Sequence, residues 1–263
     1  MIIAQISDLH IVPRGELAYG RVDTASMLCA AIAHLNRLRP APDIVLITGD
    51  ITDRGHPAAY AHCRELLAGL PAPFYVIAGN HDRPDEFRRA FTDQRYLPES
   101  GFIQYVIEEH PVRLVAIDSQ VPGRTPGRLC AERLAWLDTT LAARPDRPTI
   151  IVMHHAPFRT GLPHFDAVSL EQPDAFEAVV RRHAHVERIV CGHVHRATQI
   201  RFGGTIASAC PGTAHQDMLD LRPDAEESFS LDPPGFQLHR WNGERLYTYT
   251  VTVGDYDGPY PFS

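Results

Sequence analysis

Short, strongly apolar segments recur along this chain, and segments with helical spacing lie between them. Short runs rich in Ile, Val and Leu are typical of buried strands. We expect strands over 2–7, 44–48, 74–77, 103–107, 114–117, 149–153 and 188–191. Apolar residues at helical spacing predict helices over 23–38, 57–70, 132–141 and 174–183. This alternation predicts an α/β fold with buried sheets.

The last part of the chain has a different pattern. Asn242-Gly243 is a typical hairpin turn, and it separates expected strands over 236–241 and 246–253. We therefore expect a β-rich segment after the α/β part of the chain. The polar, proline-rich stretch 224–234 is expected to be a surface loop.

Charge and composition exclude several classes of protein. The chain has 263 residues and a formal net charge of −7, with 25 basic and 32 acidic side chains. This balance argues against a general nucleic-acid-binding protein, which presents a basic face. All the basic residues are Arg, so Schiff-base chemistry and a Walker-type phosphate loop, which need Lys, are excluded. The 15 His residues are therefore the main candidates for chemistry.

The cysteines and the apolar segments indicate the cellular compartment. The five Cys residues lie far apart and form no CxxC pair, which argues against a zinc finger and a disulfide framework. We find no secretory signal pattern, and no run approaches the ~18 apolar residues of a membrane span. We therefore expect a cytoplasmic protein with reduced thiols and no membrane association.

Polar residues follow the expected strands at five places: Asp8 with His10, Gly49-Asp50, Gly79 to Asp82, His154-His155, and Gly192 to His195. In open α/β sheets, ligands bind beyond the carboxyl ends of the strands, so we expect these side chains to converge. Residues i and i+2 of an extended segment point to the same side, which predicts that each D-x-H or H-x-H pair acts together. A glycine before a ligand residue allows a sharp turn or a close approach.

The types of residue in this set indicate metal chemistry. The set holds carboxylates, an amide and imidazoles, but no Cys. Such a mixture suits zinc, manganese or iron better than calcium or an iron–sulfur cluster. Seven ligands exceed what one ion takes, so they predict two ions bridged by a carboxylate. Two metals ~3.5–4 Å apart are a common device for in-line displacement at phosphorus.

The motifs D-x-H, GD, GNHD, HH and GHVH, in this order, resemble those of the calcineurin-like metallophosphoesterase superfamily. The tail segments 211–216 and 234–236 resemble, more narrowly, a bacterial branch of class III cyclic-nucleotide phosphodiesterases and glycerophosphodiesterases. The resemblance implies a four-layer α-β-β-α sandwich of two mixed sheets flanked by helices. Residues 1–210 would form the catalytic domain, and the β-rich extension 211–263 would pack on the same domain as a cap or an oligomer contact.

The resemblance also implies a ligand set and its cofactors. The cofactors would be two divalent or trivalent transition-metal ions, Fe, Mn, Zn or Co. The implied ligands are Asp8, His10 and His195 for one ion, Asn80, His154 and His193 for the other, and Asp50 as the bridge.

Further residues are expected beside the ions. His81 would act with Asp50 in catalysis, not as a ligand but facing the phosphoryl group or the leaving oxygen, where an imidazole can donate a proton. Asp82 is a candidate for orienting the His81 ring. Asn80 is expected to contact substrate as well as metal. Tyr19 and His215 are candidates for lining the substrate site, with an ordinary loop position as the alternative for each.

The implied reaction is hydrolysis of a small phosphodiester, a glycerophosphodiester or a 3′,5′-cyclic nucleotide, by in-line attack of a metal-bridging hydroxide. Two divalent ions, two carboxylates and a hydroxide sum to about one positive charge, which matches a diester monoanion. Tyr19 is the one aromatic residue of the loop 11–22, which favours a small headgroup over a nucleotide base. The alternatives are a phosphomonoesterase on the same site, a nuclease and a non-catalytic scaffold. The family also implies a homo-oligomer.

The remaining candidates have ordinary structural interpretations. Asp53 and Asp118 are expected to be turn or cap residues, with a supporting role beside Asp50 left open for Asp53. His155 either packs in the core or supports His154. The other histidines are expected to be surface or core residues: His34, His56, His62, His110, His164, His183, His185 and His239.

Overall fold

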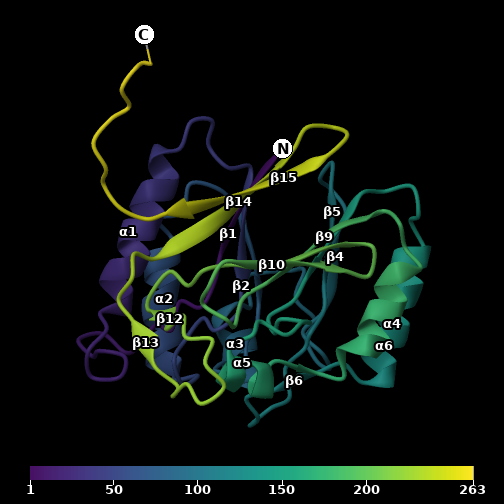
Figure 1. Ribbon diagram of the computed structural model, residues 1–263, viewed down its shortest axis with the longest axis horizontal. Helices are drawn as coiled ribbons and strands as arrows, with labels where there is room; N and C mark the ends of the chain where they lie inside the picture. Colours follow the sequence, from purple (N-terminus) through teal and green to yellow (C-terminus); the bar gives the residue numbers. More distant parts are fainter. Residues whose placement is uncertain (263) are drawn as a thin grey trace.

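The computed structural model describes residues 1–262, and it consists of two large β-sheets packed face to face with helices on both outer faces (Figure 1). Each sheet contains parallel and antiparallel neighbours, so both sheets are mixed. The predicted α-β-β-α sandwich is therefore confirmed.

The first sheet has five strands in the order β15-β14-β1-β2-β3. Their bounds are β1 Ile2–Ile6, β2 Ile44–Thr48, β3 Phe74–Ile77, β14 Gly235–Trp241 and β15 Leu246–Thr252. β1, β2 and β3 are parallel, and β14 pairs with β1 in antiparallel register. Three helices pack on this sheet through one buried apolar cluster: α1 Thr24–Arg37, α2 Pro57–Leu67 and α3 Pro84–Ala90.

The second sheet has six strands in the order β10-β11-β9-β7-β5-β4. Their bounds are β4 Tyr105–Ile107, β5 Arg113–Ala116, β7 Thr149–Val152, β9 Val186–Cys191, β10 Thr198–Phe202 and β11 Thr205–Ala209. Helices α4 (Ala131–Ala142) and α6 (Pro173–Arg181) cover its outer face, where Leu137 and Phe176 enter a second buried cluster.

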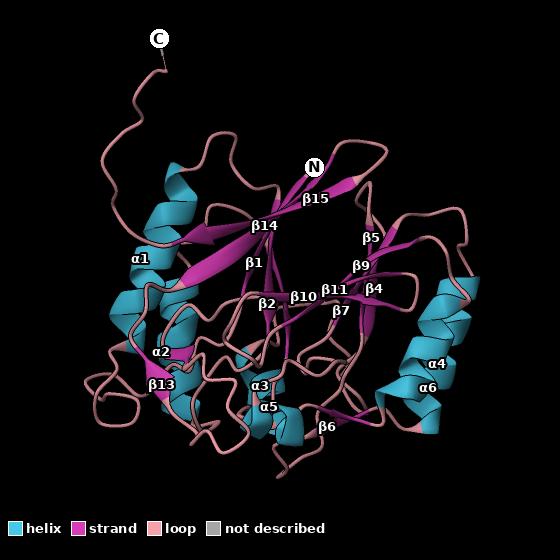
Figure 2. Ribbon diagram, in the orientation of Figure 1, coloured by secondary structure: helices cyan, strands magenta, loops and turns pink. Residues whose placement is uncertain are grey.

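A third apolar cluster lies between the sheets and holds them together. It joins Leu46 and Ile77 of the first sheet to Leu114 and Ile150 of the second. Strands β1, β2, β3, β7 and β9 all finish at one end of this sandwich, the lower edge of the view in Figure 2, where loops gather beside α3 and the short helix α5 (Pro163–Val168). Sequence segments that are far apart therefore meet at that edge.

Several elements were not predicted. The hairpin β10–β11 turns at Gly203-Gly204, a recognisable signal, but its mixture of polar and apolar residues hides the strands. α3 and α5 have seven and six residues, too few to show helical periodicity. Two small two-stranded ladders were not predicted either: β6 (Gly127–Arg128) pairs with β8 (Leu170–Glu171), and β12 (Gln216–Asp217) pairs with β13 (Phe229–Ser230).

The C-terminal segment is part of the first sheet. The predicted hairpin forms β14 and β15, and Phe236 and Val253 enter the same buried cluster as α1 and α2. The described part of this segment, residues 211–262, therefore shares a core with residues 1–210, and a domain boundary at residue 210 stays a prediction.

The expected cytoplasmic compartment stays a prediction. Within residues 1–262, no helix has both the length and the apolar character needed to cross a membrane. The five cysteines are free.

Candidate functional site

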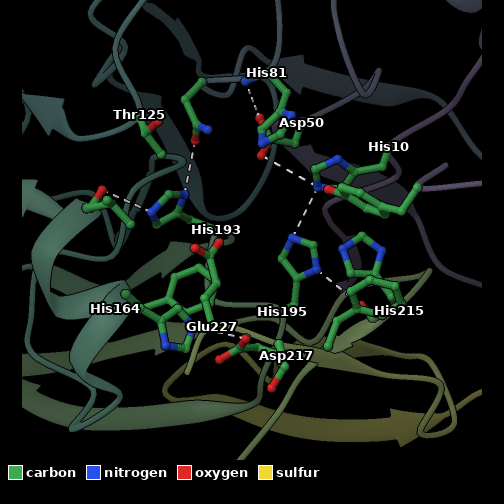
Figure 3. Close-up of a pocket in the computed structure, with 16 residues that line it drawn as sticks. His10, Asp50, His81, Thr125, His164, His193, His195, His215, Asp217 and Glu227 are labelled. Carbon is green, nitrogen blue, oxygen red and sulfur yellow. Dashed lines mark hydrogen bonds and ion pairs between the residues drawn. The ribbon is translucent and has the colours of Figure 1, made fainter. Parts of the chain in front are cut away.

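A cavity of about 370 Å³ opens at the end of the sandwich where these strands finish (Figure 3). Five of the seven expected metal ligands line it: His10, Asp50, Asn80, His193 and His195. The other two, Asp8 and His154, are fully buried directly beneath them. The structure thus brings together side chains from five separate loops.

The expected ligands of the first ion lie close together. The Nε2 atoms of His10 and His195 are 3.1 Å apart, and His195 Nε2 is 3.6 Å from Asp8 Oδ1. Because metal–nitrogen bonds are about 2.0–2.1 Å, two nitrogens at this separation can share one ion. All three side chains are buried. We call this set the first half of the centre.

The expected ligands of the second ion form a similar group, the second half. Asn80 Oδ1 lies 3.0 Å from both His154 Nε2 and His193 Nδ1. Asp50 Oδ2 lies between the halves, 3.3 Å from His154 Nε2 and 3.7 Å from His10 Nε2. This arrangement is the one that a shared, bridging carboxylate requires.

Three of the four histidines of the set have their outward ring nitrogen hydrogen-bonded to a main-chain carbonyl. His154 Nδ1 donates to the Thr48 carbonyl at 2.8 Å, His193 Nε2 to the Val168 carbonyl at 3.1 Å, and His195 Nδ1 to the His215 carbonyl at 3.1 Å. Since a carbonyl only accepts, these nitrogens carry the proton and the inward nitrogens keep a lone pair. Metal-ligating histidines are typically oriented in this way. The donor set therefore fits two transition-metal ions.

The backbone presents these side chains in a way that the sequence analysis did not foresee. Five of the seven residues adopt left-handed φ values: Asp8 at 54°, His10 at 45°, Asp50 at 48°, His193 at 70° and His195 at 51°. The expectation of extended i, i+2 pairs is therefore wrong, although each pair does converge. Non-glycine residues rarely adopt this conformation, and such strain gathers at functional sites.

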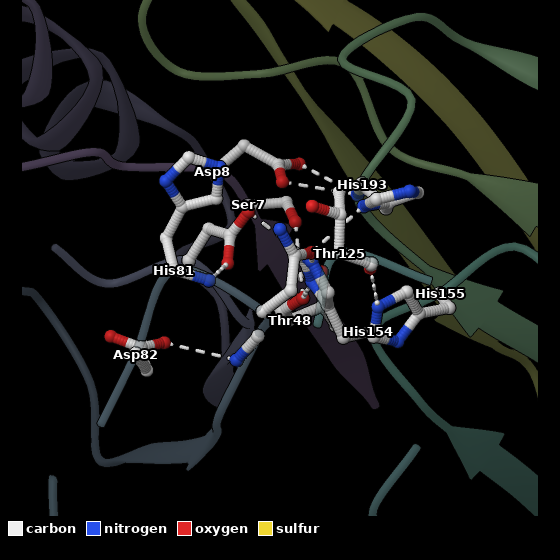
Figure 4. A network of polar contacts seen from close by, with 12 residues as sticks. Ser7, Asp8, Thr48, His81, Asp82, Thr125, His154, His155 and His193 are labelled. Carbon is white, nitrogen blue, oxygen red and sulfur yellow. Dashed lines mark hydrogen bonds and ion pairs between the residues drawn. The ribbon is translucent and has the colours of Figure 1, made fainter. Parts of the chain in front are cut away.

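Two glycines make room for the ligands. A Cβ on Gly49 would lie 2.3 Å from His154 Nδ1, and Gly49 itself has a φ of +98°. A Cβ on Gly192 would lie 2.9 Å from Asp8 Oδ2 and closer still to Ser7 Oγ. The amide of His193, the next residue, donates to both carboxylate oxygens of Asp8, at 3.0 and 3.2 Å, which ties the two sheets together (Figure 4).

Charges within the site shift its protonation equilibria. Burial would raise the pKa of Asp50, but the neighbouring His154 and His81 outweigh it and hold that pKa well below its usual range. Burial lowers the pKa of His154, but the Asp50 carboxylate prevails and raises it to about 9. Burial raises the pKa of Asp8. Bound cations would oppose protonation of all three groups, because their positive charge favours ionised carboxylates and neutral imidazoles.

His81 stands beside the ligand set. Its amide donates to Asp50 Oδ1 at 2.9 Å, and its ring nitrogen Nδ1 donates to the Asp53 carbonyl at 2.7 Å. The ring meets that of His10 edge to face, with centroids 4.6 Å apart. This geometry leaves Nε2 of His81 available to the cavity that His81 lines.

The expectation that Asp82 orients His81 is wrong. Asp82 Oδ2 accepts from the amides of Gly79 at 2.9 Å and Ile51 at 3.1 Å, and its Oδ1 accepts from the Tyr60 hydroxyl at 2.8 Å. Its carboxylate is the natural acceptor for these buried donors, so it ties the loops after β2 and β3 together.

Asp53 takes the role that Asp82 was expected to have. Its main chain accepts from His81, and its Oδ1 lies 3.4 Å from His10 Nδ1. The sequence signal was its place three residues after Asp50. The role beside Asp50 that was left open for Asp53 therefore has a geometric basis.

Tyr19 and His215 both line the cavity. The His215 ring lies 4.5 Å from that of His195 and 5.1 Å from those of Tyr19 and Phe229, so the three aromatic rings form one wall. Burial, with His195 nearby, lowers the pKa of His215 to about 2, so this imidazole is neutral.

Several lining residues were missed or misassigned. His164 was expected to be an ordinary histidine, but α5 places it in the cavity wall, 3.1 Å from Asp217. Phe165 and Phe229 also line the cavity, so Tyr19 is not its lone aromatic side chain. The stretch 224–234, expected to be a plain surface loop, contributes Glu227, Ser228 and Phe229. No local sequence pattern predicts these contacts, because they form between segments far apart in sequence.

His155 supports the site from behind. Its Nδ1 lies 2.8 Å from Ser119 Oγ, and its Nε2 donates to the Thr125 carbonyl at 3.0 Å. Burial, with His154 nearby, lowers the pKa of His155 to about 3. The side chain is therefore a neutral core residue. The other histidines that were given structural roles, His164 excepted, lie outside the lining of this cavity: His34, His56, His62, His110, His183, His185 and His239.

Comparisons with known proteins agree with this geometry. A family model described as calcineurin-like phosphoesterase matches residues 1–197. Over 100% of its length the chain is 39% identical to a protein of Arcobacter nitrofigilis named "Probable glycerophosphodiester phosphodiesterase GpdQ", and the match covers 97% of that protein. Over 95% of its length it is 30% identical to the 3',5'-cyclic adenosine monophosphate phosphodiesterase CpdA of Escherichia coli, and the match covers 88% of CpdA.

A solved structure extends the likeness to the fold. A dimetal phosphatase from Danio rerio matches with a TM-score of 0.66 over 97% of this chain and 99% of that chain, at 15% identity. At this identity the match supports the fold alone. The family model and the two bacterial relatives carry the assignment further. This chain belongs to the calcineurin-like phosphoesterase family, in the bacterial branch that contains glycerophosphodiester and cyclic-nucleotide phosphodiesterases.

Proposed function

We propose that this chain hydrolyses small phosphodiesters, a glycerophosphodiester or a 3′,5′-cyclic nucleotide, at a centre of two transition-metal ions. The ions would be Fe, Mn, Zn or Co. The observation that carries the proposal is the grouping of seven inward-facing donors into two halves around Asp50 Oδ2. The names of the relatives GpdQ and CpdA support the same substrate class.

The ligand side chains are held ready for this task. The proposed ligands are Asp8, His10 and His195 in the first half, Asn80, His154 and His193 in the second, and Asp50 between them. When bound, the two ions would polarise the phosphoryl oxygens and supply hydroxide near neutral pH. Main-chain carbonyls hold the outward nitrogens of the His154, His193 and His195 rings, so the inward nitrogen of each ring presents its lone pair to the centre. These rings therefore need no reorientation during the reaction.

His81 is proposed to donate a proton to the leaving alkoxide. Its Nδ1–H stays bonded to the Asp53 carbonyl in both protonation states, so the proton is exchanged at Nε2. The Asp53 carbonyl also fixes the ring plane. Tyr19 and His215 are proposed to contact the second alcohol group, and Asn80 the phosphoryl group.

A panel of small substrates tests the proposal. We expect the best diester to exceed every simple monoester in kcat/KM by about tenfold or more, because the site has room and contacts for a second alcohol group. Metal-reconstituted protein is assayed with cyclic nucleotides, glycerophosphodiesters, monoesters, and DNA and RNA polymers. A monoester that equals or surpasses every diester would make this a phosphomonoesterase. The polymers are expected to be poor substrates, because Asp217 and Glu227 in the cavity wall repel a polyanion.

The part played by the tail is tested by a point variant. Because β14 completes the first sheet, truncation before residue 211 would disrupt the fold. His215→Ala keeps the strands and removes a lining ring. We expect it to reduce the preference for diesters over monoesters, and an unchanged ratio would remove His215 from substrate contact.

The oligomeric state completes the proposal. We propose a homo-oligomer, and β15 offers a contact because it is an edge strand with exposed Tyr247 and Tyr249. Light scattering measures the state directly. Tyr249→Lys places a charge on that edge and is expected to shift the protein toward the monomer.

A further inference from the structure

A second cleft opens between the two sheets, apart from the cavity that holds the ligand set. It has a volume of about 670 Å³ and lies between the β10–β11 hairpin at the edge of the second sheet and the start of β15, the edge strand of the first. Strand β9 runs from one place to the other, because Arg188 near its start lines the cleft and His193 of the ligand set follows its end. The cleft and the cavity share no lining residue.

Positive charge gathers in this cleft. Its charged lining residues are Arg188, Arg201, Arg245 and Glu187, three positive charges against one negative. The chain as a whole has a net charge of −7, and no Arg lines the cavity at the ligand set. Glu244 meets Arg245 at 3.7 Å, but both side chains are exposed, and such a pair contributes little. The cleft is therefore a positive site on an acidic protein.

Arg188 is buried without an ionic partner. Arg113, another buried arginine, forms an ion pair with Glu108 at 2.9 Å. Arg188 is 7% exposed, and within residues 1–262 its one hydrogen bond is to the Leu246 carbonyl at 3.5 Å. Burial lowers the pKa of its guanidinium more than the neighbouring Glu187 carboxylate raises it. An uncompensated buried charge is costly, so an anion in the cleft that Arg188 lines would stabilise it.

The lining also indicates the class of anion. Guanidinium groups match the geometry of phosphate oxygens and can bond two of them at once. A phosphate monoester carries about two negative charges at neutral pH, which balances the net charge of the cleft. Gln199 and Thr205 add neutral hydrogen-bond donors, and Ile206 and Leu246 add apolar surface. The volume is sufficient for an organic group as well as a phosphoryl group.

We propose that this cleft binds a phosphoryl dianion, held by Arg188, Arg201 and Arg245. A phosphate monoester and free inorganic phosphate both supply such a dianion, and the apolar surface of Ile206 and Leu246 favours the monoester. The proposal goes beyond the phosphodiesterase function and does not depend on it, because none of these residues belongs to the ligand set.

A tryptophan beside the cleft reports binding there even when the metals also bind phosphate. The chain has two Trp residues, and Trp241 pairs with Leu246 of the cleft across the β14–β15 ladder. In a Trp136→Phe background, Trp241 is the one tryptophan left. Metal-loaded protein of this background is titrated with inorganic phosphate and with phenylphosphonate, whose carbon–phosphorus bond a phosphoesterase does not cleave. We expect a saturable change in Trp241 fluorescence and a rise in Tm with each anion.

Variants assign this binding to the cleft. Arg188→Met and Arg201→Gln should each raise the Kd from the Trp241 titration about 10–100-fold, because each removes a charge-assisted hydrogen bond. Arg240→Gln changes an exposed arginine of β14 that does not line the cleft, and it should keep the wild-type Kd. If the wild type and both cleft variants respond equally in fluorescence and in Tm, or none of them responds, the proposal is wrong.

The two anions identify the source of the phosphoryl group. Tighter binding of phenylphosphonate supports an organic monoester as the ligand, and equal binding supports free phosphate.

Arg188→Met further tests the uncompensated charge. Without added anion it should keep or raise Tm, because an apolar side chain of similar length replaces a buried charge that has no partner. A clear fall in Tm would show that the protein itself compensates Arg188, which contradicts the proposal. Diester turnover without added anion should be unchanged in both cleft variants, so loss of the proposed function and loss of this site give different results.

Discussion

The two halves of the candidate centre differ in charge and in backbone. The first half holds a carboxylate, Asp8, and all three of its residues have left-handed φ values. The second half holds the neutral amide of Asn80, and within it only His193 is left-handed. The halves share Asp50, which lies 3.7 Å from His10 Nε2 and 3.3 Å from His154 Nε2.

This difference indicates that the two ions are held unequally. A carboxylate attracts a divalent cation more strongly than an amide does, and the attraction is large in a buried site. The first half is therefore expected to bind its ion more tightly. The second half depends more on the shared Asp50, so its ion is expected to exchange more readily.

Removal of the shared carboxylate breaks both halves at once and has the largest expected effect. Asp50→Ala should lower diester turnover by about 10³-fold or more, because metal stabilisation is worth several kcal/mol and 1.36 kcal/mol corresponds to tenfold. Steady-state kinetics and metal analysis by mass spectrometry measure the loss. Asp85→Ala, an exposed carboxylate on α3, serves as the control. Full activity in Asp50→Ala would refute a bridged centre.

A variant of His81 distinguishes metal binding from proton donation. His81→Ala should leave both halves loaded and lower turnover by about 10²–10⁴-fold if the imidazole is a general acid. The loss should shrink for a nitrophenolate leaving group, which needs no proton. An equal loss for good and poor leaving groups would point instead to positioning of the phosphoryl group.

The side chain of Asp53 contacts the first half through His10. Asp53→Asn keeps the carbonyl that holds His81 but weakens the contact with His10 Nδ1 at 3.4 Å. We expect metal affinity in the first half to fall about 10–100-fold, as for other groups that support a ligand. Asp85→Asn, which changes an exposed carboxylate on α3, is the control and should leave metal affinity unchanged. A metal titration that is the same for Asp53→Asn and wild type would count against this role.

Asn80→Asp makes the charge of the two halves equal. It should lower the dissociation constant of the more weakly bound metal ion by about tenfold, because it adds one negative charge to the second half. Calorimetric titration of metal-free protein with Mn²⁺ measures both equivalents. Two equal affinities in the wild type would remove the difference on which this comparison depends.

Most of the fold followed from local pattern. β1, β2, β3, β7 and β9 are short apolar runs, and α1, α2, α4 and α6 have a clear apolar face, so each was predicted within a few residues. β10 and β11 were missed because their apolar residues do not alternate cleanly. α5 was missed because its six residues make fewer than two turns, too few to show periodicity.

The candidate ligands were found by a different signal, their place immediately after apolar strands. Gly49 and Gly192 precede ligand residues and indicate places where the backbone comes close to other side chains. In the structure, a Cβ on Gly49 would collide with His154, and a Cβ on Gly192 would collide with Asp8. The D-x-H and H-x-H segments are nevertheless not extended as predicted, because the backbone at Asp8 and His193 is left-handed. The sequence of each loop is enough to identify the donor residues. The directions in which their side chains point depend on the backbone conformation and on contacts with distant segments.

By itself, the sequence determined the strand–helix alternation, the donor atoms available and their order along the chain, because these depend on residue type and near neighbours. The tertiary structure decided which ring nitrogen of His154, His193 and His195 faces inward, because the carbonyls that orient these rings belong to residues distant in sequence, Thr48, Val168 and His215. It also decided the second wall of the cavity, where His164 meets Asp217 across 53 residues. Contacts of this kind arise from the packing of two sheets against each other, and no periodicity within one segment encodes them.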